Sequence, residues 1–181
     1  LRVYGEGAHR VVDDTPFGGG QGMLFRPDVV DRALQNELAL DSLERSSMKV
    51  LFTTPRGIAI RQPWLESMAS WIVTKPQASE CRKIVILCGR YEGIDERVLQ
   101  KWVDLELSLG DFVLSGGEIA AMALTDALVR LLPGVLGDER SAREDSFSNG
   151  LLEYAHYTKP RDFEGQEPPS VLLGGNHKEI D

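Results

Sequence analysis

The chain is poor in the residues that build metal centres and disulfide frameworks. It holds two cysteines and three histidines among 181 residues. Cys81 and Cys88 have no second pair, and the histidines are scattered without the spacing of metal ligands. No apolar run approaches the roughly 20 residues that a helix needs to cross a bilayer. These absences exclude a zinc finger, a disulfide-rich secreted domain and a membrane-spanning helix, and we expect a cytoplasmic globular protein.

Basic charge is also scarce. The net charge is −8, whereas a protein that binds nucleic acid normally carries a basic patch. The chain contains no G-x-x-x-x-G-K-[ST] motif, and the stretch Gly18–Gly22 lacks both G-x-G-x-x-G spacing and a strand directly before it. An ATP or NAD site is therefore not expected. From composition alone, Gly18–Gly22 is equally compatible with a flexible loop.

Short apolar runs, glycine-containing loops and helical patterns alternate along the chain. Three runs are typical of buried parallel strands: Val50–Thr53, Ile84–Leu87 and Phe112–Leu114. Helical patterns cover residues 27–43, 63–73, 94–103 and 118–132. This alternation predicts an α/β domain with a parallel sheet. Ligands of such domains bind at the carboxyl ends of the strands, where the loops 54–57, 89–93 and 115–117 are expected to gather.

Four carboxylates lie in or beside these loops, among glycines: Glu92, Asp95, Asp111 and Glu118. Acids in a first helical turn are favoured by the helix dipole, which accounts well for Asp95 and Glu118. Capping explains Glu92 and Asp111 less well, because both lie between glycines. A loop lined by backbone groups and a few acids suits a ligand with positive charge, such as an amino group or a sulfonium. Both interpretations stay open on spacing alone.

Two further charged residues have ordinary structural interpretations. Arg130 falls in the last turn of an apolar helical pattern, where a cation complements the helix C-terminus. Asp145 lies in a polar stretch, where an acid is usually solvated or caps a following helix. Trp64, Trp71 and Trp102 fall at helical positions and are expected in the core rather than on a base-stacking surface.

Six motifs in fixed order identify a family. They are Val12-Asp-Asp-Thr-Pro-Phe-Gly-Gly-Gly-Gln-Gly-Met23, Leu87-Cys-Gly-Arg-Tyr-Glu-Gly-Ile-Asp-Glu-Arg97, Ser108-Leu-Gly-Asp-Phe-Val-Leu-Ser-Gly-Gly-Glu118, Pro133-Gly-Val-Leu-Gly137, Glu144-Asp-Ser-Phe147 and His156-Tyr-Thr-Lys-Pro160. With these motifs, nearly the whole chain resembles the bacterial tRNA (guanine-N(1)-)-methyltransferases of the knotted SPOUT superfamily. The resemblance implies an α/β fold with a parallel sheet, helices on both faces and a deep trefoil knot. It also implies a homodimer whose active site lies between the subunits.

The resemblance assigns roles to particular residues. It implies that the knot binds S-adenosylmethionine in a bent shape and that Asp145, from the partner subunit, is the general base. Arg130 would assist at the guanine. The cofactor residues implied are Pro55, Gly89, Tyr91, Glu92, Leu109, Gly110, Asp111, Phe112, Val113, Leu114 and Gly116. Asp13, Gly18, Gly19 and Gly20 would help to bind the substrate. That substrate would be the guanosine at position 37 of tRNA, whose methylation guards the reading frame. The resemblance also implies magnesium dependence, with no ligand named.

The same resemblance divides the chain. Residues 1–136 would form the knotted domain that binds S-adenosylmethionine, 137–151 a linker, and 152–181 the start of a C-terminal domain that binds tRNA. Relatives have a strand and a helix before the region where this chain opens, and a basic helical domain beyond its end, so we expect a truncated core. Two alternatives remain: a knotted methyltransferase acting on another RNA site, and a non-catalytic protein that binds S-adenosylmethionine or RNA.

Overall fold

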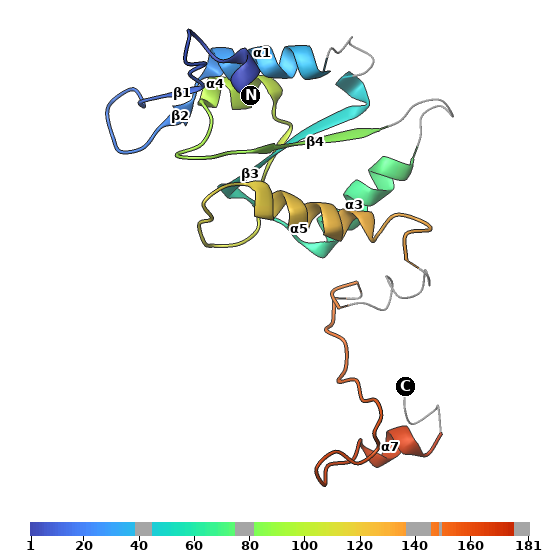
Figure 1. Cartoon of the computed structure of the whole chain (residues 1–181). Coiled ribbons are helices and arrows are strands. Elements are labelled where there is room, and N and C mark those ends of the chain that lie inside the picture. Colours follow the sequence, from blue (N-terminus) through green and yellow to red (C-terminus); the bar gives the residue numbers. More distant parts are fainter. Residues whose placement is uncertain (39–44, 75–81, 137–145, 149, 176–181) are drawn as a thin grey trace. The chain divides into compact units, whose positions relative to one another are not determined.

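The computed structural model describes residues 1–38, 45–74, 82–136, 146–148 and 150–175 (Figure 1). The chain forms two compact units, Leu1–Arg143 and Glu144–Asp181. The second unit contains the short helix α7, Ser170–Leu173, and a bridge between Phe163 and Gln166. Most of the predicted linker, including Asp145, lies outside the described residues, so the predicted domain boundaries stay a prediction.

A parallel three-stranded sheet forms the centre of the first unit. Its strands are β3 (Met48–Ala59), β4 (Lys83–Cys88) and β5 (Leu105–Ser108), in the order β4-β3-β5. Both neighbours pair parallel with β3. Val50 and Leu51 in β3 are fully buried, as continuous apolar strands covered on both faces should be. The predicted α/β class with a parallel sheet is confirmed.

The third strand was predicted in the wrong place. The residues that pair with β3 are Leu105–Ser108, whereas Phe112–Leu114 forms part of an irregular loop. Leu107 of β5 is buried in the core, but Phe112 and Val113 are 53% and 82% exposed. The apolar, β-prone side chains of Phe112–Leu114 therefore face a surface and do not fill the core. The residues 54–57, predicted as a loop, lie inside β3 at a shift of its register.

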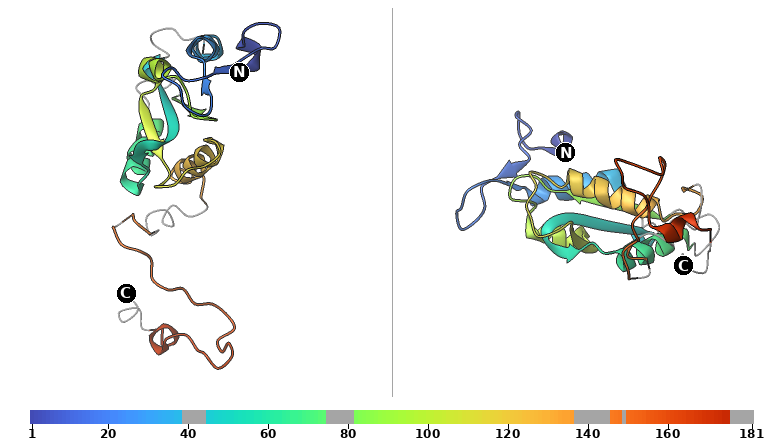
Figure 2. Two further views of the ribbon diagram at one scale, coloured as in Figure 1. Left: turned by 90° about the vertical axis from the view of Figure 1, so that its left-hand side faces the viewer. Right: turned by 90° about the horizontal axis from the view of Figure 1, so that it is seen from below.

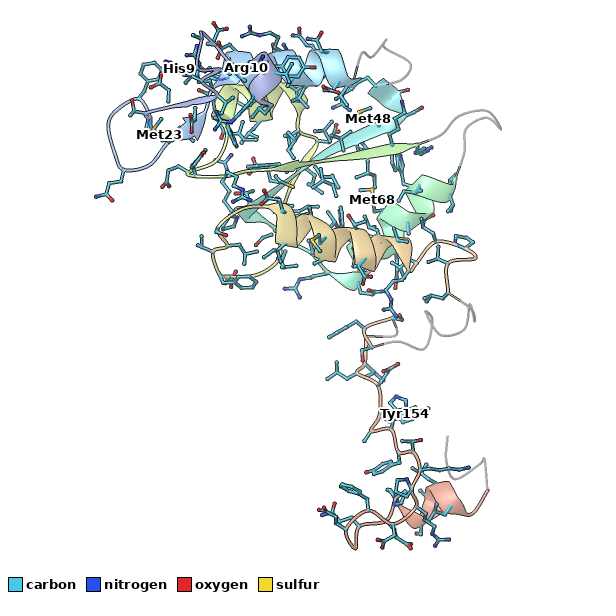
Figure 3. The ribbon with its side chains drawn as sticks, in the orientation of Figure 1. His9, Arg10, Met23, Met48, Met68 and Tyr154 are labelled. Atoms are coloured by element: carbon cyan, nitrogen blue, oxygen red, sulfur yellow. The ribbon has the colours of Figure 1, made fainter. Side chains whose placement is uncertain are left out.

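Helices cover both faces of the sheet (Figure 2). On one face, α1 (Pro27–Leu38) and α4 (Glu96–Trp102) pack with Phe52 in one hydrophobic cluster. On the other face, α3 (Gln62–Val73) and α5 (Glu118–Val129) pack against Leu51 and Leu107 in a second cluster. Met68 of α3 lies against this second cluster (Figure 3). Among the residues that the structure describes, no helix has the length and apolar character of a membrane span.

Small elements flank the sheet. The 3-10 helix η1 (Arg2–Tyr4) is followed by a two-stranded antiparallel ribbon of β1 (Asp13–Asp14) and β2 (Leu24–Phe25). The glycine-rich stretch 16–22 is the loop of this ribbon, next to which Figure 3 labels Met23. Trp64 and Trp102 pack against the two core clusters, as predicted from their helical positions. The indole N–H of Trp102 donates to a carboxylate oxygen of Asp31 at 2.6 Å.

Candidate active site

Part of β3 and the loops after β4 and β5 line a cavity of about 220 Å³ at the carboxyl ends of the latter two strands. One wall runs from Phe52 to Pro55 in β3, the second comprises the loop after β4, residues 89–93, and the third comprises most of the segment 107–117 after β5. Ala120 of α5 completes the lining. The cavity lies where an open parallel sheet normally binds its ligand.

Most residues that the resemblance assigns to the cofactor line this cavity. They are Pro55, Gly89, Tyr91, Glu92, Leu109, Gly110, Phe112, Val113, Leu114 and Gly116. Asp111 is exposed and is not among the lining residues. Three apolar members of the third wall, Leu109, Phe112 and Val113, are more than one third exposed. The cavity thus offers apolar surface beside backbone groups, the usual composition of a small-molecule site.

Close backbone approach joins the second and third walls. The amide of Gly117 donates to the carbonyl oxygen of Gly89 at 2.9 Å, and Arg90 forms an antiparallel bridge with Gly116. The hydroxyl of Thr53 lies 3.3 Å from the carbonyl oxygens of both Leu87 and Gly117. A Cβ at Gly117 would collide with that hydroxyl and would lie 2.9 Å from the Cα of Cys88. Glycine is therefore required at position 117 by contact distance.

One ion pair spans the same two loops. Arg90 Nε donates to Glu118 Oε1 at 2.8 Å, and both side chains are about half exposed. The backbone amide of Glu118 itself, and then Arg90, lower the pKa of the Glu118 carboxyl. Burial raises the pKa of the Cys88 thiol at the end of β4, so that this thiol is protonated near neutral pH and is a poor nucleophile.

The glycine-rich stretch 16–22 is connected to the second wall. The amide of Glu92 donates to the carbonyl of Met23 at 3.0 Å, and the amide of Phe25 donates to the carbonyl of Gly93 at 3.0 Å. The rings of Phe25 and Tyr91 lie edge to face with centroids 5.6 Å apart. Gly22 packs so closely on the Glu92 side chain that a Cβ would overlap it. The predicted substrate loop is thus attached directly to a wall of the cavity.

The predicted substrate residues lie on this ribbon. Asp13 is part of β1 and is partly buried, while Gly18, Gly19 and Gly20 are exposed at the loop. All three glycines have positive φ angles, 87°, 82° and 130°, and a Cβ on Gly18 or Gly19 would meet nothing within 4 Å. The adjacent Phe17 is 96% exposed. The loop therefore exposes its glycine backbone and one aromatic ring to solvent.

Of the two predicted catalytic residues, the structure describes Arg130 alone, and it does not line the cavity. Arg130 follows the last residue of α5, and its amide donates to the carbonyl of Asp126 at 3.2 Å. Because α5 begins at the cavity, Arg130 lies roughly 18 Å along the helix axis from Glu118 at 1.5 Å per residue, and it does not line the cavity. Asp145 lies outside the described residues. The structure therefore leaves both catalytic roles as predictions.

Several lining residues were not singled out from the sequence. They are Phe52, Thr53, Thr54, Arg90, Gly93, Leu107, Ser108, Ser115, Gly117 and Ala120. Most lie inside or directly beside the stretches already chosen for their glycines. Extending each glycine-rich motif to the end of the neighbouring strand would have included them. Within the described ranges, no group of three or more His, Cys, Asp or Glu side chains is arranged to hold a metal ion.

Comparison with known proteins gives one consistent result. The family model described as tRNA (Guanine-1)-methyltransferase TrmD matches residues 1–181. The chain is 49% identical over 180 residues to a tRNA (guanine-N(1)-)-methyltransferase of Gluconobacter oxydans, covering 99% of this chain and 70% of the relative. A protein of the same name from Ruegeria pomeroyi is 47% identical, with 99% and 69% covered. Another from Staphylococcus carnosus is 47% identical over 181 residues, with 100% and 68% covered.

Proposed function

The chain belongs to the tRNA (guanine-1)-methyltransferase family, and we propose that it transfers a methyl group from S-adenosylmethionine to nitrogen 1 of guanosine 37 in tRNA. The observation that carries the proposal is the family match over the whole chain, because relatives that share nearly half of its residues are all named for this reaction. Those names specify nitrogen 1 of guanine, which disfavours a methyltransferase acting on another RNA site.

The cavity fits the proposed methyl donor. Gly89, Gly110 and Gly117 each lie so close to neighbouring protein atoms that a Cβ would crowd them, so glycine lets the segments around the cavity pack closely on one another. Leu109, Phe112, Val113 and Leu114 provide an apolar surface for an adenine ring, and Glu92 at the second wall provides negative charge for an amino group or sulfonium. When bound, S-adenosylmethionine supplies a methyl group that its sulfonium already activates.

Proton removal is the task left to the protein. Ring nitrogen 1 of guanine carries a hydrogen and becomes nucleophilic only when that proton leaves. The carboxylate of Asp145 takes the proton as general base, an effect typically of about 10²–10⁴-fold. Negative charge then develops on the exocyclic oxygen of guanine, where the guanidinium of Arg130 stabilises it. The new bond joins nitrogen 1 to the methyl carbon, the bond from that carbon to sulfur breaks, and the donor leaves as a neutral thioether.

The exposed face of α5 supports a homodimer. Ile119 and Met122 are 58% and 71% exposed, and the neighbouring cavity loop exposes Phe112 and Val113. The opposite face of α5 is buried through Ala120, Leu124 and Leu128. A helix that is apolar on both sides normally lies between two layers. We therefore propose that a second copy of the chain packs on this face, and the family resemblance implies that the general base Asp145 comes from that partner subunit.

The remaining parts of the proposal follow the family resemblance. The cavity loops would form the deep trefoil knot, residues 152–181 would begin a domain that binds tRNA, and the enzyme would work in the cytoplasm. The stretch Gly18–Gly20 and Asp13 would contact the substrate, since their ribbon adjoins the cavity wall at Glu92. Magnesium dependence is kept as part of the proposal, but the described residues offer no ligand group, so no step is assigned to it.

Labelled methyl transfer to two tRNA transcripts tests the proposal. The transcripts differ only in carrying guanosine or adenosine at position 37. Label in the guanosine transcript alone, with the methyl group located on nitrogen 1 by nucleoside mass spectrometry, is the expected result. Binding of S-adenosylmethionine without label in either transcript, under conditions where a relative from Staphylococcus carnosus is active, would favour the non-catalytic binding protein.

A further inference from the structure

Strand β3 departs from regular pairing where it passes the cavity. Thr53 and Ile58 both pair with Leu107 of β5, and pairing with β4 ends at Thr53. The residues 54–57 therefore bulge from the sheet without strand partners of their own. Thr54 and Pro55 of this bulge line the cavity. Gly57 passes so close to the backbone of Leu107 that a Cβ would overlap the Leu107 amide nitrogen. Part of one cavity wall, Thr54 and Pro55, thus belongs to a segment that strand pairing does not hold in place.

Arg56 lies in this bulge and binds two carboxylates from other elements. Its Nε donates to Glu106 Oε2 at 2.8 Å and its Nη2 donates to Glu106 Oε1 at 3.0 Å, which is the paired geometry of a strong guanidinium–carboxylate contact. Nη2 also donates to Glu96 Oε2 at 2.6 Å. The side chain of Glu106 is only 28% exposed, while those of Arg56 and Glu96 are about half exposed. None of the three lines the cavity.

The three members of this cluster lie close in sequence to the three walls of the cavity, one beside each. Arg56 follows Pro55 directly. Glu106 precedes Leu107, the first residue of the third wall, and Glu96 opens α4 three positions after Gly93, the end of the second wall. A single guanidinium therefore links segments that adjoin all three walls. The contacts join residues 40 and 50 positions apart in the chain.

We propose that Arg56 is a positioning residue for the methyl donor: by binding Glu96 and Glu106 it sets the spacing of the three walls that enclose the cavity. The inference rests on the proposed function, since it takes the cavity as the site of S-adenosylmethionine. Arg56 acts through Pro55 and the two neighbouring loops and touches no reacting group. Its loss should therefore weaken binding of the donor and leave proton removal at the guanine unchanged.

The test compares Arg56→Met, which keeps the length of the side chain and removes its charge, with Arg56→Lys, which keeps the charge and loses the paired contact. Glu96→Gln and Glu106→Gln each remove the charge of one partner and keep Arg56. They replace Arg56→Met in the test if that variant does not fold. The control is Arg32→Met, because Arg32 forms a comparable exposed ion pair with Glu6 at 2.6 Å on elements that do not line the cavity. Each full-length variant is measured for affinity toward S-adenosylhomocysteine, for KM of both substrates and for kcat.

Arg56→Met should weaken affinity for S-adenosylhomocysteine and raise KM for the donor about three- to tenfold, since partly exposed ion pairs contribute modestly. The value of kcat at saturating donor and KM for tRNA should not change, Arg56→Lys should lie between parent and Arg56→Met, and Arg32→Met should match the parent. Normal affinity for S-adenosylhomocysteine in Arg56→Met would overturn the inference and leave the proposed function intact. A variant in which kcat falls and both KM values rise by the same factor would do so too. If the parent itself does not bind S-adenosylhomocysteine, the proposed function and this inference both fail.

Discussion

Gly117 gives the sharpest test of how the cavity is built. Its amide binds the carbonyl of Gly89 at 2.9 Å, and it is buried. A Cβ placed on Gly117 would overlap the Thr53 hydroxyl and would lie 2.9 Å from Cys88 Cα and 3.1 Å from Gly89 N. The hydroxyl can rotate away, but the two backbone atoms cannot move without separating the cavity walls. Gly117→Ala should therefore force the second and third walls apart.

The free-energy cost of Gly117→Ala can be estimated from these contacts. Overpacking a tightly fitted site typically costs about 1–3 kcal/mol, and loss of the bond to Gly89 adds about 0.5–1.5 kcal/mol. A middle value of about 3 kcal/mol, expressed wholly at the cavity, corresponds to a loss in affinity of roughly 100-fold. We expect Gly117→Ala to bind S-adenosylhomocysteine at least tenfold more weakly than the parent in isothermal titration calorimetry.

Gly174→Ala is the matched control for this substitution. The nearest atoms to a Cβ at Gly174 are 3.8 and 3.9 Å away, and its φ of −84° suits alanine. This variant should bind the ligand as the parent does. Affinity of Gly117→Ala within twofold of the parent would refute the reasoning, because it would mean that the walls tolerate a side chain at their closest approach.

Three further predictions concern other parts of the account. Asp145→Asn should bind S-adenosylhomocysteine normally but transfer methyl groups about 10²–10⁴-fold more slowly; unchanged turnover would remove Asp145 as the base. Met122→Glu should convert a dimer into a folded monomer in sedimentation equilibrium, since it places a charge on the exposed apolar face of α5; an unchanged mass would contradict a dimer through this face. The Arg97 side chain, and then its amide, hold the pKa of Asp95 in the folded protein below its ordinary value of 3.8. The ionised Asp95 carboxylate therefore stabilises the fold above pH 3.8, and this contribution is lost as the pH falls through the pKa of the folded state. In urea titrations between pH 6 and 2, the free energy of unfolding should fall less steeply with decreasing pH in Asp95→Asn than in the parent. Equal dependence on pH in the two proteins would be evidence against a stabilising contact between Asp95 and Arg97.

The main strands could be predicted where the sequence has a continuous apolar run. Val50–Thr53 is apolar up to Phe52 and Ile84–Leu87 is apolar throughout, because helices cover both faces of the sheet. Both predictions lie inside observed strands. Leu105–Ser108 was missed since Glu106 interrupts its apolar pattern. That carboxylate lies at the edge strand and binds Arg56. Phe112–Leu114 was mistaken for a strand because a cavity wall can be as apolar as a core.

The glycine-rich motifs predicted more of the residues at the site than the charged residues did. Gly89, Gly110 and Gly116 line the cavity as expected of loops that need close backbone approach. The cluster of Arg56, Glu96 and Glu106 had no local signal, because its members come from three separate elements that only the folded sheet brings together. For Asp95, helix capping was one of the two interpretations left open, and the structure shows it: its carboxylate accepts from the amide of Arg97 at 3.0 Å.

A crystal structure with S-adenosylhomocysteine tests the central claim most directly. The account predicts electron density for the ligand inside the cavity, between Pro55, Gly89 and the segment from Leu109 to Leu114, with the former methyl position open toward a second copy of the chain. A ligand bound elsewhere on the protein, with this cavity empty at saturating concentration, would contradict the account.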